Sequence, residues 1–222
     1  MSEGSKYDVV EIRSYEAGDR LAVRQISCDT ADKGKPVERF FRDREAAADI
    51  LTRYYTDYEP GSLSVAETGN VVVGYIAGCL DTRTYNSVMM RKILPKALAG
   101  ASARGALWRM ETWRLLTALA GSGLFRIWDK IDLDTYPAHF HINLIQDFRG
   151  KRIGLQLAER FKQKCDNSGV RGIHVEVLGD NRHGRRFFEG LGFRALCERT
   201  LILPEENRLR KSFTIVYGWA NK

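Results

Sequence analysis

Apolar and polar residues alternate regularly over one short stretch in the second half of the chain. Within residues 138–145 every second position is apolar as far as Leu144, and His139, His141 and Asn143 stand between them. A two-residue period is typical of a β-strand, because successive side chains point to opposite faces. The pattern predicts a strand with one apolar and one polar face.

The next stretch changes to the period of a helix. From Ile153 to Cys165 an apolar residue recurs every four positions, which predicts an amphipathic helix. Gly169 follows at a position suited to the left-handed conformation that ends helices. Alternation then resumes from Ile173 to Leu178. The order is therefore strand, turn, helix, strand.

The same two periods predict most of the other elements. Gly69-Asn70 lies between two apolar runs and forms a good hairpin turn. We expect helices over 18–29, 36–55 and 181–190, and strands over 9–13, 63–67, 71–78, 193–202 and 212–218.

Residues 83–134 form a long insertion between the third and fourth predicted strands. Two helices are predicted there, over 87–98 and 104–119, separated by Gly100-Ala101-Ser102. The insertion holds three of the four tryptophans, Trp108, Trp113 and Trp128. A structureless loop of that length is uncommon, so we expect it to pack. It could enlarge the core, cover an acceptor site or form a homodimer contact.

Composition sets the broad class. The chain has 222 residues and is 44% hydrophobic, with no internal repeat, so a single domain spanning 1–222 is expected. It has neither an apolar run near 18 residues nor a signal-peptide pattern, and its four cysteines lack metal or disulfide spacing. These features predict a cytoplasmic protein without a membrane partner.

The turn between the strand at 138–145 and the following helix has the layout of a phosphate cradle. It runs from Asp147 to Gly154 and carries Arg149, Lys151 and Arg152. Main-chain N–H groups in the first turn of a helix have no intrahelical acceptor, and the helix dipole places positive charge there. The turn is therefore suited to an anion.

Charge is concentrated around this turn. Residues 149–186 hold ten Lys or Arg and four Asp or Glu, so they carry most of the chain's net charge of +7. A solvated charged surface is the usual explanation of such a run. Here the basic residues begin at the anion-shaped turn and recur at Arg182, Arg185 and Arg186, which favours a ligand with several phosphates.

Two segments resemble the signatures of a known family. Residues 149–154 are similar to the Q/R-x-x-G-x-G/A motif of the GNAT superfamily of acyl-CoA-dependent N-acetyltransferases. Residues 180–193 are similar to its second motif, N-x-x-A-x-x-F-Y-x-x-x-G-F. Each match alone is weak, but the two occur in the family's order with a strand between them.

The resemblance implies a fold and an activity. The fold would be α/β (α+β), with a mixed, mostly antiparallel sheet of about seven strands flanked by helices. The sheet would be splayed between strands 4 and 5, and the helical insertion would lie between strands 3 and 4. The activity would be transfer of an acetyl group from acetyl-CoA to a primary amine, by direct attack in a ternary complex.

The resemblance also assigns residues to the cofactor. Main-chain N–H groups of the fourth strand would hold the acyl carbonyl, loop amides the pyrophosphate, and Asn181 the pantetheine arm. The residues expected to bind acetyl-CoA are Ile142, Asn143, Leu144, Arg149, Gly150, Lys151, Arg152, Ile153, Gly154, Asn181, Arg185 and Phe188. Asn181 is equally suited to an N-cap, and Phe188 to the core.

Two positions depart from the family pattern. Arg152 replaces the middle glycine, and a left-handed backbone there would cost an L-residue roughly 1 to 2 kcal/mol. Phe188 replaces a tyrosine that protonates the departing thiolate in many members. The alternative is a non-catalytic acyl-CoA-binding or protein-interaction module with the same fold.

His139 and His141 are the candidate bases, because imidazole titrates near neutral pH and the two side chains should point the same way. Paired histidines can instead be structural. A metal site is not expected, because no third ligand has suitable spacing. Asp134 and Glu67 are alternative bases, and a water chain is another.

The acceptor is weakly constrained. The first 82 residues carry a net charge of −5, which would attract a cationic amine, whereas residues 83–134 carry +5. A small-molecule amine, an amino sugar and a protein lysine all remain open. No nucleic-acid partner is expected, since no helix-turn-helix, zinc-finger or aromatic RNA-binding motif is present.

Overall fold

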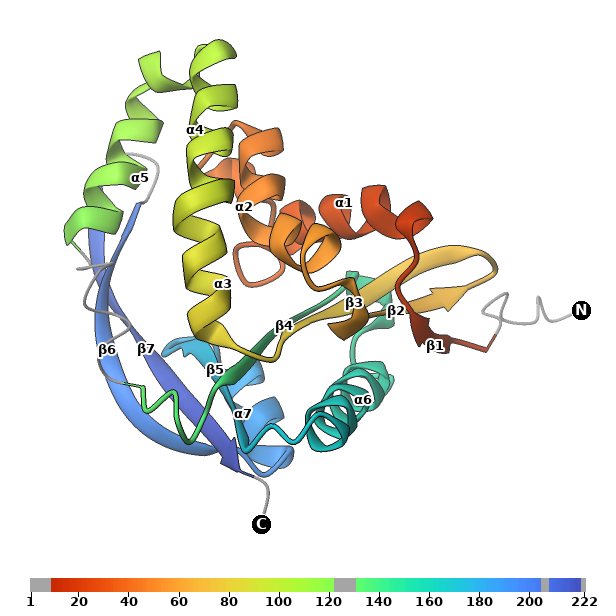
Figure 1. Cartoon of the computed structure of the whole chain (residues 1–222). Helices are drawn as coiled ribbons and strands as arrows, with labels where there is room; N and C mark the ends of the chain where they lie inside the picture. The colour runs from red at the N-terminus through yellow and green to blue at the C-terminus, as the bar shows by residue number, and fades with distance from the viewer. Residues whose placement is uncertain (1–8, 122–130, 205–207, 221–222) are drawn as a thin grey trace, which may run out of the picture.

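The computed structural model describes residues 9–121, 131–204 and 208–220. They contain a seven-stranded sheet in the order β1-β2-β3-β4-β5-β7-β6 (Figure 1). Neighbouring strands are antiparallel except for β4 and β5, which are parallel. The strands are β1 (Glu11–Ser14), β2 (Leu63–Thr68), β3 (Val71–Cys79), β4 (Ala138–Leu144), β5 (Gly172–Leu178), β6 (Arg194–Pro204) and β7 (Leu209–Ala220). This confirms the predicted mixed, mostly antiparallel sheet.

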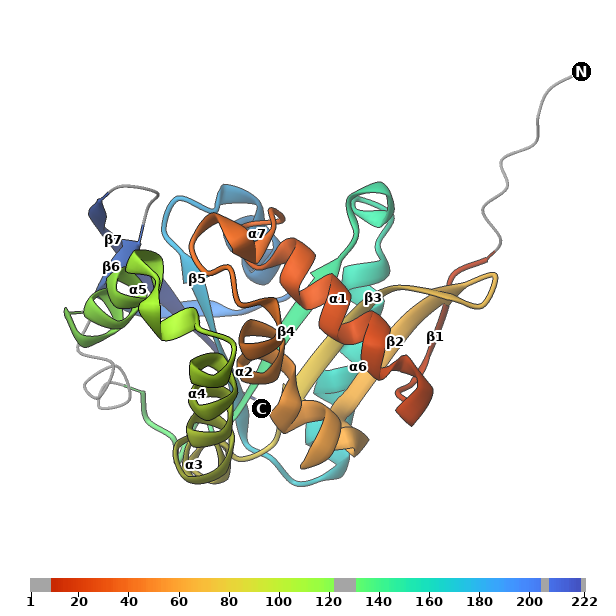
Figure 2. The same cartoon turned by 90° about the horizontal axis from the view of Figure 1, so that it is seen from above.

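Helices cover both faces of the sheet (Figures 1 and 2). They are α1 (Arg20–Thr30), α2 (Arg44–Asp57), α3 (Thr82–Val88), α4 (Leu94–Ala103), α5 (Met110–Gly121), α6 (Ile153–Asn167) and α7 (Arg182–Gly190). The apolar stripe of α6 packs on the core with Phe140 and Val175, whereas α1 and α2 pack on the other face around Tyr55 and Tyr75. None of the helices described is long and apolar enough to span a bilayer.

Two glycine predictions are confirmed. Gly69 and Asn70 both have positive φ, 54° and 64°, and join β2 to β3 in a tight hairpin. Gly169 has a φ of 67°, and its N–H donates to the carbonyl of Asp166 at the end of α6. Local turn chemistry therefore sets both chain reversals.

The prediction for the second helix was wrong at its start. α2 begins at Arg44 rather than near Pro36, because the Oδ1 of Asp43 accepts a hydrogen bond from the main-chain N–H of Ala46, at 3.1 Å. This N-cap satisfies a donor that the first helical turn leaves free. Pro36 precedes a short 3-10 turn instead.

The insertion is helical, but the sequence-based prediction placed the break between its two helices wrongly. Helix α3 continues through a π-helical turn (Met89–Ile93) into α4, so Gly100-Ala101-Ser102 lies inside a helix. Ala101 is buried against the α1–α2 layer, which explains why the small residues do not interrupt α4. The chain turns at Gly105, whose φ is 73°.

The insertion packs against the rest of the fold, as expected. α4 contacts α2, and α5 lies beside β6 (Figure 1). Trp108, Met110 and Trp113 are exposed where α4 turns into α5. The third tryptophan of the insertion, Trp128, lies outside the described residues.

The sheet opens between β4 and β5. These strands pair only at Ala138↔Ile173 and His139↔His174. Beyond this point β4 stays paired with β3 as far as Leu144, while β5 stays paired with β7 as far as Leu178. The two strands therefore separate after His139, which confirms the predicted splay and leaves one edge of β4 open.

Candidate acyl-transfer site at the split between β4 and β5

The histidines of β4 lie on one face of the sheet, as the alternation predicts. The ring centroids of His139 and His141 are 6.0 Å apart. Both side chains point toward the layer that contains α2, because Tyr55 packs edge-on against each ring. Their surroundings nevertheless differ.

His139 is a buried residue with a full set of partners. Its side chain is 7% exposed, its Nε2 lies 3.0 Å from the Tyr55 hydroxyl, and its Nδ1 lies 2.7 Å from the Thr82 hydroxyl. Either tautomer therefore leaves both ring nitrogens hydrogen-bonded. Burial lowers the pKa of His139 well below its ordinary value, which keeps the ring neutral.

His141 is exposed and retains access to solvent. In the described part of the chain, its ring nitrogens have no hydrogen-bond partner. Dense protein around the ring still lowers its pKa below the ordinary value. An imidazole that is neutral near pH 7 and open on one side has the geometry of a proton acceptor.

β5 forms the other wall of the split. His174 is 4% exposed, its Nδ1 lies 2.8 Å from the Tyr136 carbonyl, and burial lowers its pKa to about 4. Glu176 follows on the same face and is exposed. Arg199 donates from Nη1 to its Oε1 at 2.7 Å, and burial raises the pKa of the Glu176 carboxyl.

Glu176 carries no sequence signal that marks it as a functional residue. The alternation from Ile173 to Leu178 already placed it on the polar face with His174. The sequence pattern does not show that β5 pairs in parallel with β4. This pairing puts the polar face of β5 on the same side of the sheet as His141.

The predicted phosphate turn lies just beyond β4. Gly150 and Arg152 have positive φ, 75° and 62°, and Arg152 is the N-cap residue of α6. No side chain caps this helix, and the first intrahelical bond runs from the N–H of Gln156 to the carbonyl of Arg152. The earlier N–H groups therefore lack helical acceptors, as an anion site requires.

The side chains of the turn divide into two kinds. Arg149 turns back onto the chain, with Nε 3.0 Å from the Leu144 carbonyl and Nη1 3.0 Å from the Gln146 side chain. Lys151 is exposed, with its Nζ 4.9 Å from the centre of the Phe148 ring. Arg152 is exposed as well. Arg149 thus braces the turn, while Lys151 and Arg152 are exposed on it.

Helix α7 carries the remaining predicted residues. Asn181 caps the helix by accepting from the N–H of Gly184 at 3.0 Å. Arg185 donates from Nη1 to the Gly179 carbonyl at 3.3 Å. Phe188 is 8% exposed and packs on Phe140 in the core. Each structural alternative raised by the sequence is therefore present, and the cofactor roles of these residues stay predictions.

The comparison with protein families bears directly on this arrangement. The family model described as "Acetyltransferase (GNAT) family" matches residues 23–193, which is most of the chain. The chain belongs to the GNAT family of acetyltransferases. Members of this family depend on acyl-CoA, so acetyl transfer is the general activity of the fold described above.

Solved structures agree with this fold. A structure named SsHAT has a TM-score of 0.72 at 23% identity, and covers 96% of this chain and 98% of its own. YncA, a putative acetyltransferase from Salmonella typhimurium with its cofactor acetyl-CoA, has a TM-score of 0.60 at 13% identity. The match covers 96% of this chain and 94% of YncA. A polyamine N-acetyltransferase of Drosophila melanogaster has a TM-score of 0.61 at 14% identity. The match covers 96% of this chain and 100% of the Drosophila enzyme.

Within this GNAT fold, the alternative bases lie away from the split. Glu67 is on β2, which β3 separates from β4, and its Oε2 lies 2.6 Å from the Nε of Arg13. Asp134 is exposed and pairs with Arg83 at 3.1 Å. Among the described residues, no group of three or more side chains could hold a metal ion.

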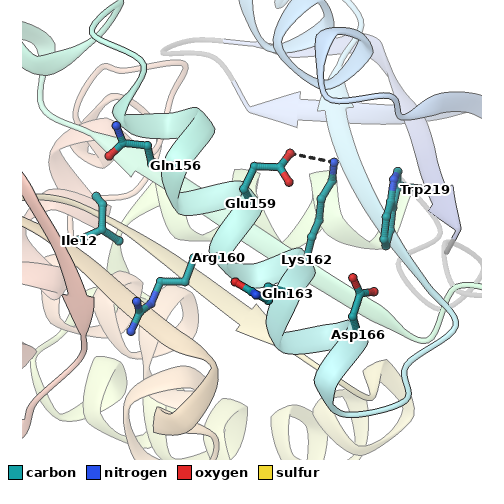
Figure 3. A pocket seen from close by; sticks show the side chains of 8 residues that line it. All are labelled: Ile12, Gln156, Glu159, Arg160, Lys162, Gln163, Asp166 and Trp219. Carbon is teal, nitrogen blue, oxygen red and sulfur yellow. Dashed lines mark hydrogen bonds and ion pairs between the residues drawn. The ribbon is translucent and has the colours of Figure 1, made fainter.

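A separate groove of about 620 Å³ follows the outer side of α6 (Figure 3). It is lined by Ile12, Gln156, Glu159, Arg160, Lys162, Gln163, Asp166 and Trp219. Lys162 is tied to Glu159 at 3.1 Å and to the Leu191 carbonyl at 2.8 Å. Because α6 covers the face opposite His141, this groove is not part of the split.

The left-handed Arg152 of this GNAT turn gives a stability prediction. Arg152→Gly should raise the free energy of unfolding by about 1 kcal/mol, because glycine adopts this conformation without a Cβ clash. The same change should weaken acetyl-CoA binding, since it removes a guanidinium beside the anion site. Denaturant unfolding and titration calorimetry measure the two effects.

Arg152→Ala is the matched control. It removes the guanidinium but keeps a Cβ at a φ of 62°. Acetyl-CoA binding should therefore weaken without any gain in stability. Equal stability of the glycine and alanine variants would show that the backbone of this turn is not strained.

Proposed function

We propose that this protein is an N-acetyltransferase that moves the acetyl group of acetyl-CoA to a primary amine by direct attack in a ternary complex. One observation carries the proposal: an exposed, neutral His141 stands on β4 where that strand loses its pairing with β5. β4 thereby carries both a candidate base, His141, and main-chain N–H groups that, within the described residues, have no partner strand at its open edge.

The reaction can be followed on the chain's own groups. His141 takes a proton from the ammonium of the acceptor, and the amine nitrogen then attacks the thioester carbonyl carbon. The main-chain N–H groups of Ile142 and Leu144, which alternate with those that β4 donates to β3, face the developing oxyanion, and such donors are worth roughly 3 kcal/mol each. The C–S bond then breaks, the thiolate of coenzyme A leaves, and the extra proton on the attacking nitrogen passes to solvent water.

The cofactor would extend from the split to the turn before α6. The uncapped N–H groups at Ile153 and Gly154, with Gly150, Lys151 and Arg152, would hold the pyrophosphate. Asn181 and Arg185 of α7 lie beyond β5 and would contact the pantetheine arm. Phe188 would exclude water beneath the thioester.

The leaving thiolate has no acid at Phe188, because this ring is buried and cannot donate a proton. A thiol has a pKa near 8.5, so departure as the thiolate is tolerable around neutral pH. The lack of a proton donor at Phe188, together with the left-handed backbone at Arg152, supports a second candidate function. That candidate is a module that binds acyl-CoA without turning it over.

Two measurements test the proposal in sequence. Acetyl-CoA should raise the thermal midpoint of unfolding more than mononucleotides or duplex DNA do. Release of free thiol from acetyl-CoA should then depend on an added amine, across small amines and lysine-containing peptides. Stabilisation by acetyl-CoA without amine-dependent thiol release would favour the binding module, and stabilisation by DNA alone would contradict both.

A further inference from the structure

The carboxylate of Glu176 is held in position by an ion pair with β6. Arg199 on β6 donates from Nη1 to its Oε1 at 2.7 Å. The Arg199 side chain is only 5% exposed, and in the described part of the chain its Nε and Nη2 have no partner. Burying a guanidinium this way is costly, so the pair is a built feature rather than a chance surface contact.

The register of the last paired residues places Glu176 and His141 on the same face of the sheet, on the two sides of the split. The last pair between the two strands is His139↔His174, and each of the two residues in question lies two positions further on the same face. His141 and Glu176 are therefore the first residues on that face beyond the last pair, one on each wall of the split.

Glu176 remains available for a ligand. About a third of its side chain is exposed, although burial is the largest cause of the rise in its pKa. Arg199 contacts one carboxylate oxygen, which leaves acceptor capacity on the group.

The position of Glu176 favours contact with a part of the acceptor other than its reacting amine. A carboxylate beside the reacting ammonium would stabilise its charged form and oppose transfer of the proton to His141. The proton acceptor and the open main-chain edge both belong to β4, whereas Glu176 belongs to β5. β4 thus serves the reacting amine, and Glu176 on β5 serves another group of the acceptor.

We propose that Glu176 binds a second cationic group of the acceptor, so that the substrates are diamines or amines with another basic group. This inference rests on the proposed acetyl transfer. It goes further by naming the substrate class and the residue that selects it. Charge-assisted hydrogen bonds from an ammonium to an oriented carboxylate supply the discrimination.

Matched acceptors test this on the unaltered protein. With acetyl-CoA, kcat/KM for 1,4-diaminobutane should exceed that for butylamine by tenfold or more, because butylamine has the same carbon chain but no second charge. Glu176→Gln should remove this preference mainly by raising KM for the diamine. Glutamine keeps an oxygen for Arg199, and a thermal melt confirms folding. Equal kcat/KM values for the two amines would overturn the inference.

Glu198→Gln is the matched control. Glu198 precedes Arg199 on β6, is exposed, and points to the other face of the strand. The control should keep the diamine preference. Binding of 1,4-diaminobutane to the complex with coenzyme A, followed by calorimetry, gives a readout without chemistry. Binding that depends on Glu176 in the absence of turnover would uphold the inference while contradicting the proposed function, and binding unchanged by Glu176→Gln would overturn the inference alone.

Discussion

Replacing His141 by glutamine is expected to lower kcat by roughly 10²- to 10⁴-fold, the usual contribution of a positioned general base. His141 is exposed at the split, and no partner in the described residues occupies its ring nitrogens. Glutamine preserves hydrogen bonding but cannot accept a proton near neutral pH. Steady-state turnover of acetyl-CoA and amine measures the loss.

The pH profile gives an independent signature of the same residue. The neutral imidazole is the active form, and the surroundings of His141 lower its pKa. The acidic limb of kcat/KM should therefore fall with a midpoint below the ordinary value of about 6.5. This limb should be absent in the glutamine variant.

His139→Gln is the matched control on the same face of the same strand. Its ring holds Tyr55 and Thr82 in a buried network, so the change should reduce the free energy of unfolding by about 1 to 3 kcal/mol and leave the acidic limb in place. If both variants kept full turnover and an unchanged profile, neither histidine would be the base.

Removing the outward charges of the turn before α6 should have the next largest effect. The double variant Lys151→Ala, Arg152→Ala is expected to weaken acetyl-CoA binding by roughly 100-fold or more, since each hydrogen bond to a charged group is worth about 1.5 to 3 kcal/mol. Arg149 is left intact, because its guanidinium braces the turn through Leu144 and Gln146. Titration calorimetry measures the dissociation constant.

Acetyl-pantetheine separates charge from other effects in this test. It carries the thioester without the pyrophosphate, so its binding should be the same in the double variant and in the unaltered protein. Lys164→Ala removes one positive charge from the opposite end of α6 and should leave acetyl-CoA binding nearly unchanged. If the double variant weakened the binding of acetyl-CoA and acetyl-pantetheine equally, the turn would not contact the phosphates.

The parts of the fold that the sequence predicted well are those with short-range causes. The hairpin at Gly69-Asn70 and the end of α6 at Gly169 depend on residues that tolerate positive φ. The errors at α2 and in the insertion have longer-range causes. α2 starts where Asp43 provides a cap, and α4 continues through Gly100 because Ala101 packs on the neighbouring helices.

The same distinction applies to the candidate site. The alternation of β4 and the basic turn could be read from neighbouring residues, because strand period and helix-terminus chemistry act over a few positions. The left-handed backbone at Arg152 was suggested only by the glycine that the family motif has at that position. Sequence could not separate His139 from His141. That difference comes from Tyr55 and Thr82, which lie 84 and 57 positions from His139.

The sequence by itself therefore determined the order of elements, the anion-shaped turn and the pair of histidines, since each follows from local periodicity or turn chemistry. Tertiary structure alone decided which histidine is open and that Glu176, held by Arg199, lies on the same face across the split. The physical reason is that burial and hydrogen-bond partners come from segments distant in sequence, and these set the chemistry of a side chain.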